Sequence, residues 1–427
     1  MFYEKMKKYG YIFVVMLLSL MLFTSALHAQ NNTNSPYSRY GYGDLTHAVS
    51  SNSRAMGGLS VGLRDSEHIN ITNPASYTVM DSLTFLFDGG VTLQNANFSD
   101  GTYKQNAKNS SVNYFAMQFR FSKRTAMSIG LKPYSSVGYN VSQYYSDDTV
   151  EDNYSSLSFV GDGGLHEIYG GIGLKLFKNL SVGANFSYIW GDINHYIQQA
   201  FPANSYAIPF NRTDNVDVRS FKFDLGAQYE HRINSRNLLV IGATFSPKQS
   251  LSNKSSVVDQ LGNSTTGYTT TETRDHVTCE IPMSVGLGAT YRYDQRILVG
   301  ADLTYQKWED VKYASQDGLF CDEAKVSVGG EYLPNLYGRS FFANIKYRFG
   351  AFYSLPYYKI NGKRAANEFG ISGGFGLPAP RSGSVINLSA QYIRVQGKDA
   401  AFLDENILQV TVGLTFNERW FFKRRVN

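Results

Sequence analysis

The residues best suited to chemistry in this sequence are one serine in a glycine-rich turn and four scattered histidines. Gly58-Leu59-Ser60-Val61-Gly62 fits the G-x-S-x-G spacing that presents a nucleophilic serine in α/β hydrolases. That motif requires a strand, a tight turn and a helix, and the sequence around Ser60 predicts none of these elements. The histidines show no serine that the sequence can pair with them (His166, His195, His231 and His276). We therefore predict that the protein is not an enzyme and has no catalytic residues.

The two cysteines, Cys279 and Cys321, are too few for a disulfide scaffold and lack the spacing of a metal site. We expect no metal and no cofactor. Both thiols map near one rim of the architecture predicted below. Whether they form a disulfide stays open at this stage.

The charge balance excludes one class of partner. The chain has a formal net charge of +5, and residues 1–29 contain Glu4 and three lysines, so their removal leaves +3. Lysines and arginines are scattered, apart from Lys423-Arg424-Arg425 at the end of the chain. This pattern gives no electrostatic footprint for nucleic acid.

The first 29 residues have the three parts of a secretory signal peptide. Lys5, Lys7 and Lys8 form a positive region, Tyr11–Phe23 is apolar, and Thr24–Ala29 is small and weakly polar. The apolar run is shorter than the roughly twenty residues that a helix needs to span a bilayer. We expect cleavage after Ala29 and no transmembrane helix in the mature chain.

From Ser82 to the C-terminus, apolar and polar residues alternate with the period of a β-strand. In Ser220–Glu230, for example, Phe221, Phe223 and Leu225 share one face, whereas Lys222 and Asp224 share the other. The same pattern predicts fourteen strands, at 82–98, 112–122, 125–140, 165–177, 180–195, 219–233, 236–250, 274–294, 296–312, 321–334, 340–355, 367–379, 383–396 and 405–418.

The connectors distinguish a membrane barrel from a soluble sandwich. Tight links such as Ser122–Thr125 and Phe177–Leu180 alternate with long ones such as His195–Val218 and Leu251–Arg274. Many segments also exceed the roughly 9–11 residues that a tilted strand needs to cross the hydrocarbon layer. Short turns at one end and long loops at the other are typical of an outer-membrane barrel. We predict an all-β fold, a transmembrane antiparallel β-barrel of about fourteen strands.

The charges within these strands fix which face points inward. A Lys or Arg facing lipid at mid-membrane costs about 2–4 kcal/mol. The polar face should therefore line the lumen, where charges must pair with one another or with a plug. These residues are Arg120, Lys132, Glu167, Lys175, Lys222, Asp224, Asp302, Lys325, Glu331, Lys346 and Arg348.

Arg54–Phe87 is too polar and too rich in Gly, Ser and Asn to build a core of its own, so we expect the barrel to surround it. Arg54-Ala55-Met56-Gly57-Gly58, followed by Asn73-Pro74-Ala75 and Asp81, resembles the N-terminal hatch of the FadL-type outer-membrane transporters. The alternative is that Asn73-Pro74 is an ordinary turn. The resemblance implies a luminal hatch, uptake of long-chain fatty acids and other hydrophobic molecules, and a hatch or gating role for Arg54, Gly57, Gly58, Asn73, Pro74 and Ala75.

The third predicted strand carries Pro133 in its middle, flanked by Gly130 and Gly138. Proline cannot donate to the ladder, so a bulge or local gap is expected there. In the FadL family a kink in the third strand opens a lateral hole. The resemblance therefore implies a lateral opening at these three residues; a bulge that only bends the sheet is the alternative.

The predicted divisions are a signal peptide at 1–29, an N-terminal arm and hatch at 30–81, the barrel at 82–418 and a periplasmic tail at 419–427. We expect a monomer in the bacterial outer membrane, in contact with its lipid. The predicted function is passive uptake of hydrophobic, fatty-acid-like small molecules. A non-transport barrel that partners a secretion system in surface export and a general porin stay open as alternatives.

Overall fold

The barrel wall is a closed ring of fourteen antiparallel strands among the described residues of this computed structural model. The structure describes residues 33–47, 49–82, 84–146, 154–201, 207–263, 267–275, 277–314, 318–335, 340–379, 383–397 and 403–419. The predicted signal peptide, the end of the predicted tail from residue 420 and several loops lie outside these ranges. No helix in the described part is long and apolar enough to cross a bilayer.

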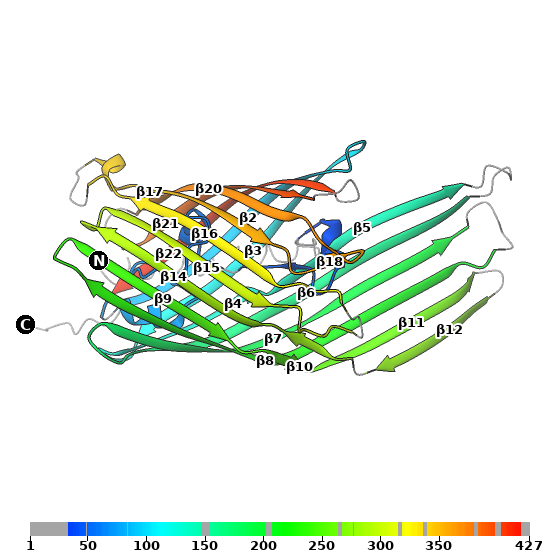
Figure 1. The fold of residues 1–427 in the computed structure, drawn as a ribbon, viewed down its shortest axis with the longest axis horizontal. Coiled ribbons are helices and arrows are strands. Elements are labelled where there is room, and N and C mark those ends of the chain that lie inside the picture. Colours follow the sequence, from blue (N-terminus) through cyan, green and yellow to red (C-terminus); the bar gives the residue numbers. More distant parts are fainter. Residues whose placement is uncertain are drawn as a thin grey trace, which may run out of the picture.

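Each strand of the ring pairs with its neighbour along the chain, and β22 pairs back onto β2 from Thr84↔Arg419 to Ser99↔Asp404 (Figure 1). The strands are β2 (Thr84–Ser99), β3 (Lys104–Arg120), β4 (Thr125–Pro133), β6 (Tyr154–Lys175), β7 (Leu180–Ala200), β8 (Phe210–Arg232), β9 (Asn237–Ser246), β14 (Met283–Tyr293), β15 (Ile297–Lys307), β16 (Glu323–Tyr332), β17 (Lys346–Leu355), β20 (Asn367–Pro378), β21 (Val385–Gln396) and β22 (Asp404–Arg419). All fourteen overlap the predicted segments, so the predicted fold class is confirmed.

Alternation places the apolar residues on the outside, as predicted. Leu303 is 48% exposed and Phe349 is 68% exposed on the outer face, whereas Asp302 and Arg348, one position before each, are buried in the lumen. A continuous apolar exterior around a polar interior is the arrangement that a bilayer requires of a closed barrel.

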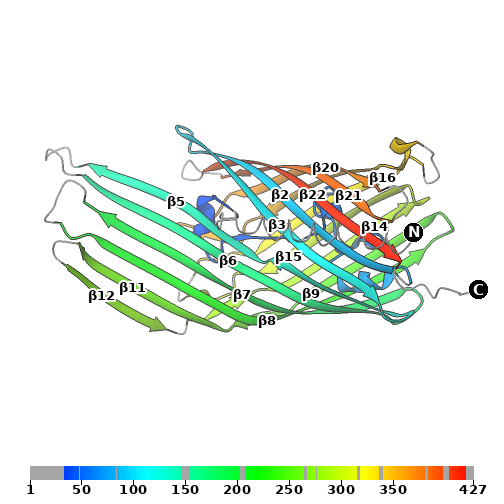
Figure 2. The ribbon, with the colours of Figure 1, turned by 180° about the vertical axis from the view of Figure 1, so that it is seen from behind.

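The structure corrects several predicted segments. Three barrel strands extend beyond the barrel and form, with three more strands, a sheet that we call the wing. It is made of the outer halves of β6, β7 and β8 together with β5 (Ser135–Ser146), β11 (Asn253–Asn263) and β12 (Gly267–Asp275). Figure 2 shows the wing running past the rest of the barrel at the long-loop end. The predicted loops at 195–218 and 251–274 are thus largely strand.

Two predicted strand ends are also wrong. Phe341–Asn344 forms the 3-10 turn η3 at the short-turn end, and β17 begins only at Lys346. Pro282 divides the predicted segment 274–294, because Cys279–Ile281 (β13) pairs with Gln249–Leu251 (β10) in a separate two-stranded sheet. A further small hairpin, β18 (Lys359–Ile360) with β19 (Lys363–Arg364), lies in the loop before β20.

The N-terminal residues lie inside the barrel in two parts. We call Thr33–His47 the arm; it contains the 3-10 turn η1 (Pro36–Arg39) and β1 (Asp44–Leu45). We call Val49–Ser82 the hatch; it contains α2 (Ser51–Arg54) and the 3-10 helix η2 (Pro74–Val79). Most of the hatch is buried, and the strands that surround it at the short-turn half supply its polar partners.

Candidate functional site in the lumen

The hatch is fixed to the wall by a carboxylate that accepts consecutive backbone donors. Asp302 of β15 accepts hydrogen bonds from the amides of Ser60 (2.5 Å) and Val61 (2.7 Å), with that of Gly62 at 3.3 Å. Gly288 and Gly242 on the neighbouring strands let this turn approach, because a Cβ at Gly242 would lie 2.1 Å from the Val61 carbonyl oxygen. Ser60 therefore anchors the hatch, and the hydrolase geometry suggested by its spacing is not formed.

Asn73-Pro74-Ala75 begins η2 and packs against β7 and β8. The Asn73 side chain caps the helix by accepting from the Ala75 amide (3.2 Å), and its Nδ2 donates to the Val61 carbonyl (2.8 Å). A Cβ at Gly183 or Gly226 would collide with Pro74. The motif thus joins the two halves of the hatch and seats them against the wall.

Arg64 holds the hatch together from its centre, and sequence reasoning missed it. Its Nε donates to Glu230 of β8 (2.6 Å), Nη1 donates to the Ala75 carbonyl (3.1 Å), and Nη2 donates to Thr78 (2.8 Å). Its partners lie on η2 of the hatch and on the distant strand β8, and the pairing with β8 cannot be inferred from one sequence. The available signal was that Arg64 is one of few basic residues in this stretch.

Arg54, Gly57 and Gly58 lie together at the other side of the hatch. Gly57 and Gly58 have φ of 68° and 88°, which favour glycine, and the Gly57 amide donates to Ser372 on β20 (2.8 Å). The Arg54 carbonyl accepts from Gln391 (2.8 Å), while its side chain lines a cavity described below. Within the described residues no ion pair joins the Arg54 guanidinium.

Most of the predicted luminal charges pair with each other or with the hatch. Glu167 contacts Lys132 at 3.0 Å and Lys222 at 3.8 Å, and Arg348 contacts Glu331 at 2.7 Å. The remaining partners lie on the hatch or nearby: Lys346 with Glu67, Arg120 with the Met80 carbonyl, and Lys222 with Asp224. Lys325 instead lies over the Phe352 ring at 4.6 Å. The lumen of the short-turn half is therefore largely neutralised.

One cluster has the composition of a cation site. Ligand atoms of Asp65, Glu67 and His68 lie within 4.8 Å of one another. The Lys346 ammonium, however, already binds Glu67 at 2.5 Å, and His68 is hydrogen-bonded to Asp65 on one side and faces Asn387 on the other. These three residues are thus engaged in seating the hatch against β17 and β21.

The third strand breaks at Pro133. β4 pairs with β3 only from Phe115↔Leu131 to Arg120↔Ala126, and beyond Tyr134 the chain continues as β5, which pairs with β6 and not with β3. On the long-loop side of Phe115, β3 pairs with β2 alone. The wall therefore splits between β3 and β5. Gly130 lies below the break, Pro133 at it, and Gly138 on the edge of β5 above it.

Glycines bend β6 and β7 at the level of the break in the third strand. Gly163 and Gly164 of β6 and Gly191 of β7 have φ between 106° and 145°, and a Cβ at Gly164 would lie 2.4 Å from the Ser135 carbonyl oxygen. The bend carries β5 and the wing away from β3, as Figure 1 shows.

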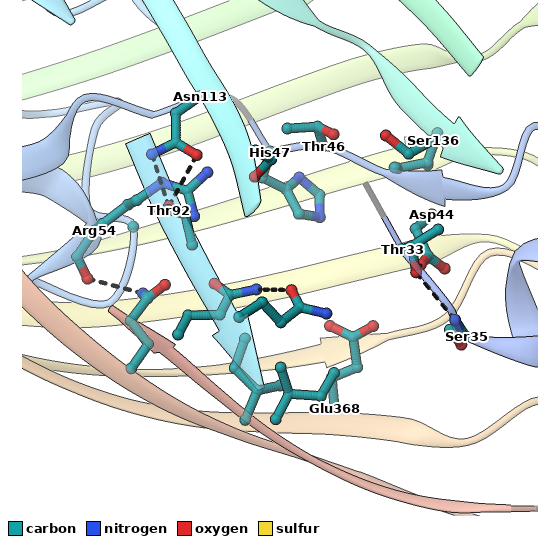
Figure 3. Close-up of a pocket in the computed structure, with 18 of the residues that line it drawn as sticks. Thr33, Ser35, Asp44, Thr46, His47, Arg54, Thr92, Asn113, Ser136 and Glu368 are labelled. Carbon is teal, nitrogen blue, oxygen red and sulfur yellow. Dashed lines mark hydrogen bonds between the residues drawn. The ribbon is translucent and has the colours of Figure 1, made fainter. Parts of the chain in front are cut away.

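A cavity of about 220 Å³, which we call the side chamber, lies behind the split (Figure 3). Ser111, Val112 and Asn113 of β3 and Pro133 and Ser136 on the other edge contribute to its wall. Arg54, His47, Asp44 and Glu368 contribute charge, whereas Leu45, Phe98, Val395 and Ile407 contribute apolar surface. Burial, opposed by a hydrogen bond from Thr33, raises the pKa of Asp44 to about 7.

The long-loop end is closed by aromatic packing that we call the mouth cluster: Tyr42, Trp308, Tyr313, Phe320 and Tyr357. Tyr42 is fully buried at its centre, with ring centroids 4.7 Å from Tyr313 and 5.9 Å from Trp308. Cys279 belongs to the same core; Cys321 lies nearby, and both thiols are free. The disulfide that the sequence left open is not formed.

Comparison of structures shows what this architecture resembles. The chain is similar to the CymD monoaromatic hydrocarbon channel (16% identity, TM-score 0.60, covering 88% of this chain and 99% of that chain). It is also similar to the Ralstonia pickettii toluene transporter TbuX (15% identity, TM-score 0.60, covering 87% of this chain and 98% of that chain). A third similar structure is a Pseudomonas aeruginosa FadL homologue (14% identity, TM-score 0.58, covering 89% of this chain and 100% of that chain). At these identities the likeness shows a shared fold, which confirms the FadL-type architecture.

Comparison of sequences gives one result at the family level. The model of a family described as BamG matches residues 7–427. A search of curated proteins found no match.

Proposed function

The chain belongs to the BamG family, a family of outer-membrane barrels related to the FadL type, and we propose that it is a passive conduit for hydrophobic small molecules. Molecules of fatty-acid-like character would enter at the long-loop end, which faces outward in barrels of this kind. They would leave sideways into the membrane. The protein would work as a monomer in the bacterial outer membrane, after loss of residues 1–29, without a cofactor.

The observation that carries this proposal is the position of the side chamber behind the split. A hydrophobic molecule that leaves a barrel by its periplasmic end must cross water, whereas one that leaves through the wall passes directly into lipid. Here β3 and β5 lack mutual pairing at the level where Val112 and Pro133 line the chamber. The proposal takes Gly130, Pro133 and Gly138 as the residues that shape this lateral opening.

The hydrocarbon and toluene channels with the same fold support the substrate class. The chamber is only half apolar in character, so an amphipathic molecule fits it better than a pure hydrocarbon. The hatch motif at Asn73–Ala75, together with Arg54, Gly57 and Gly58, would form the floor that prevents direct passage to the periplasm.

The test is binding and uptake of a labelled fatty acid by purified protein in vesicles. Ser136→Trp would fill the chamber beside the split, and Ser284→Trp would place the same ring in a second luminal cavity of about 190 Å³ that Ser284 lines. We expect the first variant to abolish uptake and the second to retain it. Equal loss in both, or no uptake by the unmodified protein, would count against the lateral route.

The wing favours a second candidate, a barrel that partners other proteins in secretion or surface export. β12 pairs only with β11 in the described structure, and its residues are exposed along the strand from Gly267 to Arg274. An exposed strand edge is a template for pairing with another chain. Stable co-purification of a large secretion complex, lost when β11 and β12 are deleted although fatty-acid uptake persists, would favour this role.

A general porin is the third candidate function, and the swelling of protein-containing vesicles in sugar solutions tests it. Two cavities of about 220 and 190 Å³ in the described lumen share His47, Val49 and Gly58 in their walls, and the hatch beside them is bonded to the barrel wall. We expect no swelling, since a polar solute would need the hatch to leave.

A further inference from the structure

A groove on the outside of the protein, which we call the bend groove, lies where the wing leaves the barrel. Its volume is about 670 Å³, and its lining comes from β6, β7 and β8, the strands that Figure 2 shows running from the barrel into the wing. Two cross-strand pairs line it: Trp190 lies opposite Arg219. Asp192 lies opposite Asp217. Gly191 also lines the groove and has a φ of 145°, so the bend of β7 passes through it.

The alternation of the strands directs these side chains outward. Val216 and Val218 of β8 belong to the buried core on the inner side. Since neighbouring residues of a strand point to opposite faces, Asp217 between them points outward. On the barrel side of the groove, Ile168 of β6 is exposed, whereas Glu167 is buried in the lumen. The bend groove therefore faces the surroundings of the barrel.

The half of the groove next to the barrel is aromatic. Tyr188 and Trp190 lie on one face of β7, with ring centroids 6.0 Å apart and planes inclined by 16°. Toward the short-turn end the outer surface continues with the exposed rings of Phe221 and Phe223. Tryptophan and tyrosine gather at the level of the lipid head groups, and an apolar band lies next to them. The groove therefore lies at the head-group level on the long-loop side, which is the outer leaflet.

The half of the groove next to the wing is polar. Asp192 and Asp217 are directly paired on β7 and β8, and like charges in this arrangement destabilise a sheet. Arg219 donates to the two oxygens of Asp217 at 3.1 and 3.3 Å. Asn194 donates to Asp192 at 2.9 Å and accepts from Asn215 at 2.6 Å. Each carboxylate has more acceptor sites than these contacts use, so both can accept from further hydroxyl groups.

This combination of groups indicates the chemistry of an occupant. A sugar ring has a face of C–H groups that packs on aromatic side chains, and it has hydroxyls that donate to carboxylates. A phosphate fits less well, because Arg219 is the only cation among the described lining residues and Asp217 already binds it. The two carboxylates would also repel a phosphate. Apolar surface at Ile168 and Phe221 lies where the acyl chains of a lipid would pack.

We propose that the bend groove binds the saccharide head group of a glycolipid in the outer leaflet. One sugar ring packs against Tyr188 and Trp190, its hydroxyls donate to Asp192 and Asp217, and the acyl chains lie along Ile168. A lipid held there contacts the barrel and the base of the wing, so it would stabilise the angle at which the wing leaves the barrel. The inference depends on the location in the outer membrane and not on the proposed transport.

The first test measures lipid binding to the purified protein in detergent by native mass spectrometry. The probes are a diglucosyl diacylglycerol and a phosphatidylglycerol with the same acyl chains, so they differ only in the head group. We expect the glycolipid to bind about tenfold more tightly. Equal binding would overturn the proposal, and tighter binding of phosphatidylglycerol would overturn it in favour of a phosphate site.

The second test removes the aromatic half. Tyr188→Ala and Trp190→Ala should each weaken glycolipid binding by about two- to tenfold, the range of one aromatic contact. Tyr353→Ala is the matched control, because Tyr353 is an exposed tyrosine near the long-loop end of β17, which pairs with β16 and β20. It should leave binding unchanged. A loss in Tyr353→Ala as large as that in Tyr188→Ala would show a general effect of interfacial aromatic residues and refute a site.

The third test changes the charge of the groove and leaves the rings in place. The double variant Asp192→Asn with Asp217→Asn removes two negative charges and frees Arg219 from its carboxylate partner. Glycolipid binding should weaken and phosphatidylglycerol binding should strengthen, so the preference between the two lipids narrows or reverses. An unchanged preference in folded, heat-modifiable barrels would mean that the carboxylates do not select the head group, and the assignment would be wrong.

Discussion

Removing the Asp302 carboxylate should release the Ser60–Gly62 turn of the hatch without unfolding the barrel. In Asp302→Ala the amides of Ser60 and Val61 lose acceptors at 2.5 and 2.7 Å, and the Gly62 amide loses a longer contact at 3.3 Å. A hydrogen bond to a charged group contributes about 1.5–3 kcal/mol. Counting the two short bonds, the turn should lose about 3–6 kcal/mol of protection, less whatever water recovers.

The assay is hydrogen exchange in detergent or bilayer, followed by mass spectrometry of peptides that cover the hatch. A loss of about 3–6 kcal/mol corresponds to faster exchange of these amides by about two to four orders of magnitude. Peptides from β14 and β15 should keep their protection, since the ladder from Met283↔Lys307 to Tyr293↔Ile297 does not use the Asp302 side chain. Asp302→Asn keeps one carbonyl acceptor, so the exchange rate of the hatch amides in this variant should lie between those of the unmodified protein and of Asp302→Ala.

Two results would refute this reasoning. Unchanged exchange at Ser60 and Val61 would mean that packing, not the carboxylate, holds the turn. Loss of protection throughout the barrel would mean that the hatch is part of one cooperative unit with the wall, and the division between fixed wall and separate plug would be wrong.

Three further predictions concern the arm, the hatch and the outer face. Burial among Glu368, Glu405, His47 and Thr33 raises the pKa of Asp44 to about 7 when the arm is docked on β5, so the docked arm binds the proton more tightly than the released arm. Docking of the arm should therefore be strongest below about pH 4 and weaken as the pH rises to 7, which would be seen as faster maleimide labelling of Ser136→Cys. Asp44→Asn should abolish this pH dependence. Gly183→Val should displace η2, because its Cβ would lie 2.4 Å from Pro74, and limited proteolysis should cut the hatch while β7 stays folded. Leu303→Lys should cost about 2–4 kcal/mol of barrel stability in bilayers, whereas Thr304→Lys, which faces the lumen, should cost less.

The membrane-spanning part of the fold could be predicted because lipid imposes a strict rule on it. Every spanning strand needs an apolar outer face, so segments such as Ser220–Glu230 alternate visibly, and tight turns such as Tyr293–Arg296 mark their ends. The wing escapes this rule. Its strand β11 carries Val257 and Val258 side by side, and β12 is a run of threonines and charges, so neither shows the period that identified the barrel.

Fewer of the residues in the luminal site could be predicted from the sequence, for a related physical reason. Asn73-Pro74-Ala75 and Gly57-Gly58 could be singled out because glycine and proline report local backbone geometry, and their hatch or gating role stays a prediction. Arg64 and the arm gave no comparable signal. Their roles come from partners on distant strands, such as Glu230 for Arg64 and Ser136 for Asp44, and one sequence does not record such pairings.

The distribution of charge bears on how a hydrophobic molecule could pass through a polar lumen. Glu167, Glu331 and Lys346 lie in the part of the lumen that holds the hatch, and each has an ionic partner there. The side chamber brings apolar residues such as Leu45, Phe98 and Ile407 to the level of the split, together with the charged side chains of Arg54 and Glu368. A molecule that turns sideways above the hatch therefore meets a wall that is partly apolar and partly charged, which under the proposed function favours an amphipathic molecule.

A plug can block the lumen and can also be the part that moves, and the contacts of the hatch bear on which of these two roles it has here. A hatch tied down by ion pairs cannot move without exposing several buried charges at once, which is costly. The arm is held by a two-residue ladder, by hydroxyl contacts that include Ser35 on the Glu405 carboxyl, and by one ion-pair contact, His47 with Glu323 at 3.2 Å. The hatch makes two ion pairs to the wall, Arg64 with Glu230 and Lys346 with Glu67, so we expect it to stay in place as the floor, and the proposed route leads from the mouth to the split and not to the periplasm.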